Sequence, residues 1–322
     1  MKIVFLKWFP YDKRNEAISS SLNAKCFFIY SQIKRTVWNA PFRYFLQFFK
    51  TIKLLYNEKP DIIFVTNPPI FAPLTVYLYC FIFKEPQYIV DSHSGSFSKR
   101  WSTFEQLHRF LSRNAKLTIV TNHNFENIYR GWGAKTFILS DLVFEIKKSR
   151  DVELSKQFNI SCICSFDPDE PIEEILSVAQ EMPEVSFYIT GNYKRYCMNI
   201  SEGKTSNIHF TGFLNDQDYF DLLYACDAVM VLVKEENTMQ QGAYEAVSIK
   251  KPMILSNTNV LRTTYKFGTV FVDNNVDSIK KGILQMKNNH DEYILESEDN
   301  YQDRKEVWER KCLQLKYYIY NK

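Results

Sequence analysis

The sequence has 322 residues, of which 45% are hydrophobic and 24% are charged. This length suits two domains of ordinary size, and the composition is that of a globular protein. The net charge of +3 is too small to indicate a protein that binds nucleic acid.

Neither a membrane span nor a metal site is expected. The longest apolar run, residues 70–83, is shorter than the roughly 20 residues that a spanning helix needs. Met1 and Lys2 lead straight into a predicted strand, so we expect no signal peptide and a cytoplasmic protein. Cys162 and Cys164 are a close pair with no second pair to complete a zinc site. We therefore expect reduced cysteines.

In chain order, the first half alternates strand and helix patterns. Short apolar runs predict strands at residues 3–6, 26–30, 62–66, 88–90 and 117–121. Helix-like segments lie between them, at residues 16–22, 42–56, 70–83, 104–113 and 124–132. Such alternation is typical of a doubly wound parallel sheet.

The second half follows the same logic after a hinge predicted at residues 139–155. Strands are predicted at residues 160–164, 185–190, 208–210, 228–233 and 253–255. The intervening helices are expected at residues 171–181 and 218–224 and from Gly242 onward, and a final charged helix at residues 303–320. We expect an α/β protein with two Rossmann-like domains.

The most informative segment follows the strand at residues 228–233. Polar residues end this strand, Gly242 and Ala243 open a helix, and Glu245 lies one turn inside it. The free N–H groups and partial positive charge of a helix N-terminus favour an anion. Glu245 can accept hydrogen bonds from two hydroxyls, such as those of a ribose. An anion beside a diol indicates a nucleotide diphosphate.

This segment resembles the donor-binding motif of the GT-B glycosyltransferases, especially the family-4-like bacterial enzymes (glycosyl transferases group 1). That motif has two Glu separated by seven residues. When Glu245 is aligned with the second Glu, Asn237 stands in place of the first, which in the family contacts the donor sugar. Asn237-Thr238-Met239-Gln240 replaces Glu-Gly-Phe-Gly, whereas Gly242, Ala243 and Pro252 fit the family. The departure leaves the sugar and the stereochemistry open.

The resemblance covers nearly the whole chain and implies the GT-B architecture, in which two parallel sheets face a central cleft. The expected acceptor domain is residues 1–140, and the nucleotide-sugar donor domain is residues 155–300. Residues 301–322 would form a helix that crosses back to the first domain.

The resemblance also implies which residues bind the donor. The turn at Ser165 lies close to the diphosphate in the family, and the base lies near the turn at Gly212. Backbone N–H groups of residues 239–242 would hold the diphosphate, and Glu245 the ribose. The predicted donor-binding residues are Ser165, Phe166, Gly191, Asn192, Gly212, Phe213, Asn237, Thr238, Met239, Gln240, Gln241, Gly242 and Glu245.

The segment Asp91-Ser92-His93-Ser94-Gly95 follows the strand at residues 88–90. His93 can bind a sugar or stabilise a leaving group, or it can be a structural residue of a turn. Bacterial relatives carry a similar Asp-x-His-x-Gly, and Asn67-Pro68-Pro69 together with His93 resembles the eukaryotic β-1,4-mannosyltransferase of lipid-linked oligosaccharide synthesis. The resemblance favours a catalytic His93. The mannosyltransferase likeness implies inversion with Asp91 as candidate base, whereas the family-4 likeness implies retention.

On the acceptor side the resemblance points to Tyr11, Arg14 and Asn67. Arg14 can contact a diphosphate-lipid acceptor, or it can be an ordinary surface charge. The helix predicted at residues 42–56 has a broad apolar face with Lys50 and Lys53 nearby. This pattern fits a helix at a membrane interface as well as a half-buried core helix.

These expectations combine into a metal-independent hexosyltransferase without a cofactor, whose co-substrate is a nucleotide-diphosphate sugar. The expected acceptor is a glycan, specifically a lipid-linked intermediate of bacterial capsule or O-antigen synthesis. We expect peripheral contact with the inner face of the plasma membrane and no nucleic-acid partner. Two alternatives remain open: a non-catalytic sugar-nucleotide-binding partner subunit and a GT-B type sugar-nucleotide epimerase.

Overall fold

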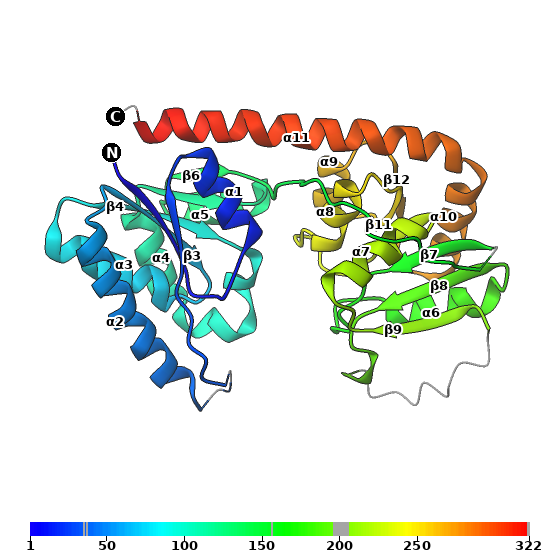
Figure 1. The fold of residues 1–322 in the computed structure, drawn as a ribbon, viewed down its shortest axis with the longest axis horizontal. Helices are drawn as coiled ribbons and strands as arrows, with labels where there is room; N and C mark the ends of the chain where they lie inside the picture. Colours follow the sequence, from blue (N-terminus) through cyan, green and yellow to red (C-terminus); the bar gives the residue numbers. More distant parts are fainter. Residues whose placement is uncertain (35, 37, 156, 196–205, 321–322) are drawn as a thin grey trace. The chain divides into compact units, whose positions relative to one another are not determined.

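The computed structural model describes residues 1–322 except 35, 37, 156, 196–205 and 321–322 (Figure 1). The chain divides into two compact units. Unit 1 comprises Met1–Leu142 and Val307–Lys322, and unit 2 comprises Val143–Glu306. The boundary at Leu142 falls inside the hinge predicted from the sequence.

Unit 1 contains a parallel sheet of six strands within the described residues, in the order β2-β1-β3-β4-β5-β6 (Figure 1). The strands are β1 (Ile3–Lys7), β2 (Lys25–Phe28), β3 (Ile62–Asn67), β4 (Gln87–Ser92), β5 (Leu117–Val120) and β6 (Thr136–Ile138). The helices are α1 (Lys13–Ser21), α2 (Ala40–Glu58), α3 (Phe71–Phe83), α4 (Glu105–Asn114) and α5 (His123–Gly131), with short turns η1 (Ser94–Phe97) and η2 (Lys99–Phe104).

The central strand β3 shows why this sheet is buried on both faces. Side chains alternate along a strand, so Ile62 and Phe64 pack with α1 and the end of the last helix, whereas Ile63 and Val65 pack with α2 and α3. Each fully buried side chain of this size stabilises the fold by roughly 1.5–3 kcal/mol. Because helices cover both faces of the sheet, neither set of alternating side chains faces water. Residues 62–65 of β3 are accordingly all apolar.

Unit 2 contains a second sheet of six parallel strands in the described chain, in the order β12-β11-β10-β7-β8-β9. The strands are β7 (Phe158–Cys162), β8 (Val185–Thr190), β9 (Ile208–Gly212), β10 (Ala228–Val231), β11 (Met253–Ser256) and β12 (Thr269–Val272). The helices are α6 (Ile172–Glu181), α7 (Asp216–Ala225), α8 (Gln241–Ser248), α9 (Asn259–Thr264), α10 (Val276–Asn288) and the first half of α11 (His290–Tyr320), whose residues from Val307 onward belong to unit 1. The predicted α/β class and the two Rossmann-like sheets are confirmed.

Several elements differ from the sequence prediction. Strand β6 and the whole run from α9 to α10 were not predicted. Helix α11 begins at His290, well before the predicted start at residue 303. Its first half carries polar residues with no regular apolar stripe, so its helical periodicity is weak in the sequence.

A buried polar network lies beneath the carboxyl end of β3. The Asn67 amide and the Tyr129 hydroxyl both lie within hydrogen-bond distance of Nε2 of His108, at 2.8 and 2.6 Å. The Tyr129 hydroxyl also contacts Ser92 at the end of β4. Burial lowers the pKa of His108 to about 4, so the ring is neutral near pH 7. Because the amide nitrogen of Asn67 can only donate, Nε2 accepts. The network ties α4 and α5 to the ends of the two central strands.

The network predicts a specific pH dependence of stability. Between pH 6.5 and 4 the unfolded chain protonates His108 while the folded protein does not. The free energy of unfolding should therefore fall with decreasing pH, by up to about 1.4 kcal/mol per pH unit from this group. His108→Gln should flatten the slope between pH 7 and 5, measured by urea unfolding.

The control is His123→Gln, which replaces a largely exposed ring on α5. This variant should keep the slope of the wild type. An unchanged slope in His108→Gln would contradict the assignment of a buried neutral imidazole.

Candidate active site

Arg14 on α1 is buried at the carboxyl end of the first sheet. Its Nη2 and Nε donate to the carboxylate of Asp91, at 3.1 and 3.3 Å, and its Nη1 donates to Asp141 at 2.7 Å. The carbonyls of Leu139 and Ser140 accept the remaining hydrogens, each at 2.9 Å. All five guanidinium N–H groups are thus used inside unit 1. The predicted contact of Arg14 with an acceptor is not supported by this geometry.

Asp91 also accepts a hydrogen bond from Nε2 of His93, at 3.2 Å. Burial alone would raise the pKa of Asp91, but the nearby Arg14 guanidinium, and then His93, outweigh it and hold the pKa far below its usual value. A group with so low a pKa has little affinity for a proton near pH 7. The geometry therefore gives Asp91 an orienting role and does not suit it to be the base of an inverting reaction.

His93 is held in one orientation. Since an ionised carboxylate can only accept, the hydrogen-bonded Nε2 must carry the hydrogen, which leaves Nδ1 as the nitrogen for a ligand. The backbone N–H of His93 donates to the carbonyl of Asn67 at 2.9 Å. The side chain is 26% exposed. A fixed, partly accessible imidazole at a strand end suits the predicted catalytic role.

Of the other two predicted acceptor-side residues, Asn67 is buried and Tyr11 is exposed. The side chain of Asn67 is enclosed by its contact with His108, so Asn67 positions His93 through its backbone and does not present its amide to solvent. Tyr11 is exposed, and its hydroxyl donates to Glu16 at 2.8 Å. Tyr11 stays a predicted acceptor contact.

The turn after β7 carries an internal anion that sequence reasoning did not anticipate. The Glu170 carboxylate accepts from the backbone N–H groups of Ser165, at 2.9 and 3.0 Å, and of Phe166, at 2.8 Å. Burial raises the pKa of Glu170, although these hydrogen bonds act in the opposite direction. The ring of Phe166 is buried in the core of unit 2. In the turn that the resemblance places close to the diphosphate, the backbone N–H groups of Ser165 and Phe166 are therefore bonded to Glu170.

The two predicted glycine turns lie together. The N–H of Gly191 donates to the carbonyl of Gly212 at 3.0 Å. A Cβ on Gly191 would lie 1.9 Å from the carbonyl oxygen of Cys164, and φ is +94°, so only glycine fits. A Cβ on Gly212 would have no described atom within 4 Å. The neighbouring Phe213 is 89% exposed and Asn192 is exposed as well.

Helix α8 starts directly against the end of β7. A Cβ on Gly242 would lie 2.9 Å from Cδ1 of Ile163, so glycine permits this close packing. Glu245 accepts a hydrogen bond from the hydroxyl of Tyr219 on α7, at 2.6 Å. Burial, followed by the charge of Glu245, raises the pKa of Tyr219 well above its usual value. The phenol thus stays protonated and orients the carboxylate, an interaction that no local pattern in the sequence indicates.

The residues before α8 form an irregular segment. Gln240 is the N-cap residue, and its side chain makes no capping hydrogen bond within the described chain. Met239 packs its side chain against the core of unit 2, so a donor contact from it would come from the backbone. Asn237 and Gln241 are exposed, and Thr238 is half-buried. The structure thus brings the predicted diphosphate-binding segment to the start of α8.

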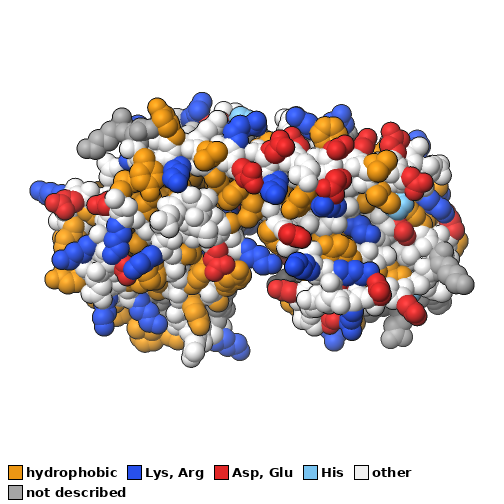
Figure 2. All heavy atoms as spheres, turned by 45° about the horizontal axis from the view of Figure 1, so that its top comes forward, with side chains coloured by type: hydrophobic (Ala, Val, Ile, Leu, Met, Phe, Trp, Pro, Cys, Tyr) orange, Lys and Arg blue, Asp and Glu red, His pale blue; other side chains and the backbone are white. Residues whose placement is uncertain are grey.

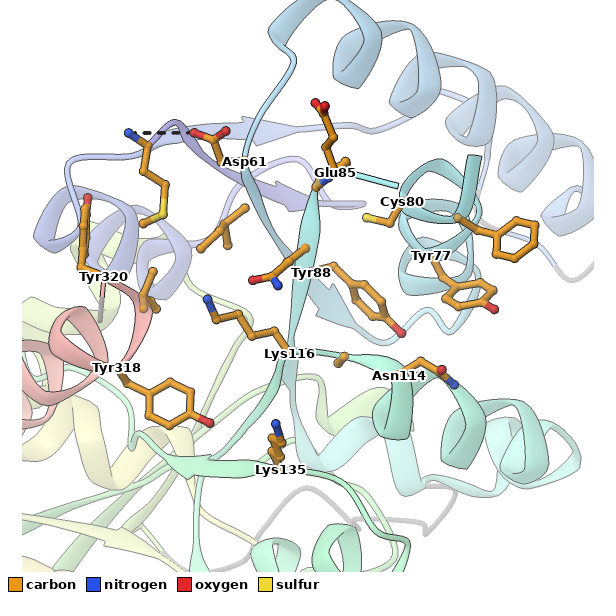
Figure 3. Close-up of a pocket in the computed structure, with 17 residues that line it drawn as sticks. Asp61, Tyr77, Cys80, Glu85, Tyr88, Asn114, Lys116, Lys135, Tyr318 and Tyr320 are labelled. Carbon is orange, nitrogen blue, oxygen red and sulfur yellow. Dashed lines mark ion pairs between the residues drawn. The ribbon is translucent and has the colours of Figure 1, made fainter. Parts of the chain in front are cut away.

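A pocket of about 1300 Å³ opens at the opposite edge of the first sheet, where its strands begin (Figure 3). Lys116, Lys135 and Tyr318 lie around it, together with Asp61 and Glu85. In open α/β sheets ligands bind at the carboxyl ends of the strands, and none of the predicted site residues lines this pocket. We therefore place the candidate site at the carboxyl ends.

The described part of the chain contains no cluster of potential metal ligands. Among those residues no group of three or more His, Cys, Asp and Glu side chains is placed to hold a metal ion. The carboxylates described above are hydrogen-bonded to protein donors.

Comparison with known proteins supports the assignment of the fold. Residues 167–289 match the family model of the glycosyl transferases group 1. No curated protein matches the sequence. Sucrose-phosphate synthase from Thermosynechococcus elongatus has a similar structure, with a TM-score of 0.75 at 14% identity over 98% of this chain and 97% of that chain.

Two further structures resemble the chain. Anabaena HepE in complex with UDP and glucose has a TM-score of 0.71 at 13% identity, covering 100% of both chains. UDP-GlcNAc 2-epimerase from Methanocaldococcus jannaschii has a TM-score of 0.60 at 13% identity, over 88% of this chain and 92% of that chain. The chain therefore has the GT-B fold, and its residues 167–289 match the glycosyl transferases group 1, which confirms the resemblance to that group seen in the sequence.

Proposed function

We propose that this protein transfers a sugar from a nucleotide-diphosphate sugar to a glycan acceptor. The observation that carries this proposal is the Glu245 carboxylate, which lies one turn inside α8. It is oriented by the hydroxyl of Tyr219 and belongs to the segment that matches the family. The start of this helix favours a diphosphate, and Glu245 can accept from the ribose hydroxyls. The exposed Phe213 ring beside Gly212 offers a surface for the base.

The same groups account for the chemistry. Backbone N–H groups of residues 239–242 would stabilise the charge that develops on the leaving diphosphate. His93 keeps the catalytic role that the resemblance implies, with Asp91 and Asn67 as positioning residues. Because HepE was solved with UDP and glucose, UDP-glucose is the first donor to test for the proposed hexosyl transfer.

A sugar-nucleotide epimerase is a second candidate. The fold similarity to the UDP-GlcNAc 2-epimerase favours it, as does Asn237 in place of the first Glu of the transferase motif. An epimerase converts a UDP-sugar without an acceptor. Turnover of the donor alone therefore distinguishes this candidate from a transferase.

We propose that the acceptor is lipid-linked, as in bacterial capsule or O-antigen synthesis, and that unit 1 contacts an anionic membrane surface. None of the helices in the described chain is long and apolar enough to span a bilayer. However, α2 and α3 expose large apolar side chains, including Phe42 at 60% and Phe81 at 68%. This aromatic face consists of Phe42, Phe45, Phe49, Tyr56, Phe81 and Ile82.

The aromatic face has the composition of an interfacial surface. Its α2 members are spaced three, four or seven residues apart, so they lie on one side of the helix. Lys50 and Lys53 are exposed on the same helix, and Figure 2 shows hydrophobic side chains interspersed with basic ones on unit 1. Such a face binds headgroups through apolar burial and attraction to anionic lipid.

Glu245→Ala should weaken binding of UDP-glucose by roughly 10- to 150-fold. Hydrogen bonds to a charged group contribute about 1.5–3 kcal/mol, and every 1.4 kcal/mol is about tenfold in affinity. Isothermal titration of the donor measures the effect. Glu298→Ala removes an exposed carboxylate on α11 and should bind as the wild type does. Unchanged affinity in Glu245→Ala would rule out the ribose contact.

His93→Ala should lower turnover by roughly 100-fold or more, the usual contribution of a positioned acid–base group, while affinity for UDP-glucose stays the same. Release of UDP with a bacterial lipid extract as acceptor measures turnover. His123→Ala, on the surface of α5, is the control and should retain activity. Full activity in His93→Ala would remove this residue from the reaction.

Phe45→Ser combined with Phe49→Ser should reduce binding to vesicles that contain anionic phospholipid, because both exposed rings would otherwise be buried in the interface. Co-sedimentation measures the bound fraction. Leu295→Ser replaces an exposed apolar side chain of unit 2 and should not change it. Equal sedimentation of the double variant and the wild type would refute the membrane contact.

A further inference from the structure

A second, smaller pocket of about 200 Å³ lies at the carboxyl ends of β1 and β3, beside α2 and η2. Since a water molecule takes up about 30 Å³ of liquid, this volume corresponds to roughly seven waters. Pro68 and Pro69 form part of its wall, directly after Asn67, whose carbonyl holds His93. The other lining side chains that matter here are aromatic, basic or amide: Trp8, Tyr44, Trp101, Arg43, Arg100 and Gln47.

Arg43 is the unusual member of this pocket. The residue is only 8% exposed, and its Nη1 is buried with no hydrogen-bond partner among the described residues. No carboxylate lines the pocket within the described chain, and Arg43 forms no ion pair with a described residue. An isolated buried charge costs several kcal/mol. An anion bound in the pocket would remove that cost.

Gln47, one turn further along α2, provides a second buried polar atom without a hydrogen-bond partner among the described residues. It is 3% exposed, and its Nε2 donates to the carbonyl of Ile29 at 2.9 Å. This contact fixes the amide so that Oε1 is an acceptor, and Oε1 is buried without a donor among the described residues. An unsatisfied buried group costs about 1–3 kcal/mol. The ligand should therefore carry a hydroxyl or another donor next to its anionic group.

The aromatic side chains around these two groups make polar and cation–π contacts of their own. The indole Nε1 of Trp8 donates to Thr51 at 2.9 Å. The guanidinium of Arg43 lies 5.3 Å from the ring centre of Tyr44, and that of Arg100 lies 5.5 Å from that of Trp101. Aromatic walls with a few placed polar groups are typical of small-molecule sites, and flat rings suit the apolar face of a sugar.

We propose that this pocket binds a phosphorylated sugar. Arg43 pairs with the phosphate, Gln47 accepts from a sugar hydroxyl, and the aromatic rings hold the pyranose. The assignment rests on the proposed function, in which this pocket is the acceptor subsite beside His93. The phosphosugar can be the head of a lipid-linked diphosphate acceptor or a free sugar phosphate, since both present the same groups.

The test uses the full-length protein and N-acetylglucosamine 1-phosphate as the probe. Tryptophan fluorescence reports binding, because Trp8 and Trp101 line the pocket. We expect a saturable change that is at least tenfold tighter than with inorganic phosphate or with uncharged methyl N-acetylglucosaminide. Arg43→Met should weaken binding at least tenfold. Lys287→Met, which removes an exposed cation of α10 in unit 2, should leave the affinity for the probe unchanged.

Gln47→Glu is a second variant in case Arg43→Met folds poorly. It retains the shape of the side chain and supplies Arg43 with an internal carboxylate, so it should abolish binding of the probe. In every variant, isothermal titration measures the affinity for UDP, which shows whether unit 2 is still intact. Equal probe affinity in both pocket variants and the wild type, or no saturable response in a wild type that binds UDP, would overturn the proposal. Probe binding in a wild type that fails to bind UDP would support the pocket and count against the proposed transferase.

A final experiment distinguishes a lipid-linked phosphosugar from a free sugar phosphate. The probe is linked through a diphosphate to a polyprenyl chain and presented in phosphatidylcholine vesicles. If Arg43-dependent binding is tighter by tenfold or more than with the free probe, the ligand is lipid-linked. If the affinities are similar, a free sugar phosphate is the ligand.

Discussion

The buried ion pair between Arg14 and Asp91 is the contact on which the candidate site of unit 1 depends. Arg14 joins the end of β4 to the chain that leaves β6, since Leu139 and Ser140 accept from the same guanidinium. Removing one partner of a buried pair typically costs about 3–5 kcal/mol. Because Arg14 keeps Asp91 ionised, the ring of His93 has one preferred orientation.

In unit 2 the candidate site also depends on a carboxylate held by a hydrogen bond, here from the neutral phenol of Tyr219 in place of an arginine. Tyr219 fixes Glu245, and the backbone of Ser165 and Phe166 fixes Glu170. The contact of Glu170 limits where the diphosphate of the donor can bind. With the N–H groups of that turn bonded to a carboxylate of the chain, the start of α8 is the remaining predicted place for the diphosphate.

Helix α2 carries residues of both surfaces that we propose for unit 1, the phosphosugar pocket and the aromatic face. Arg43, Gln47 and Leu55 are buried on its inner side, whereas the aromatic face points outward. The spacing of four residues separates the two sides cleanly. An acceptor with a phosphosugar head and a lipid tail has one part that suits each side of this helix, which gives the polar head and the apolar tail separate binding surfaces.

The sequence by itself determined the architecture and the segment that we propose as the donor site. Uninterrupted apolar runs such as residues 62–65 require cover on both faces, and Gly242 followed by Glu245 marks a helix start that suits a nucleotide. Only the tertiary structure decided what the polar residues do. Arg14 meets Asp91 across 77 residues and Tyr219 meets Glu245 across 26, and periodicity reports which face a side chain takes but not which neighbour it meets. The resemblance pointed to Arg14 and Asn67 as acceptor contacts. In the structure both are buried, Arg14 holds Asp91, and the carbonyl of Asn67 holds the backbone of His93.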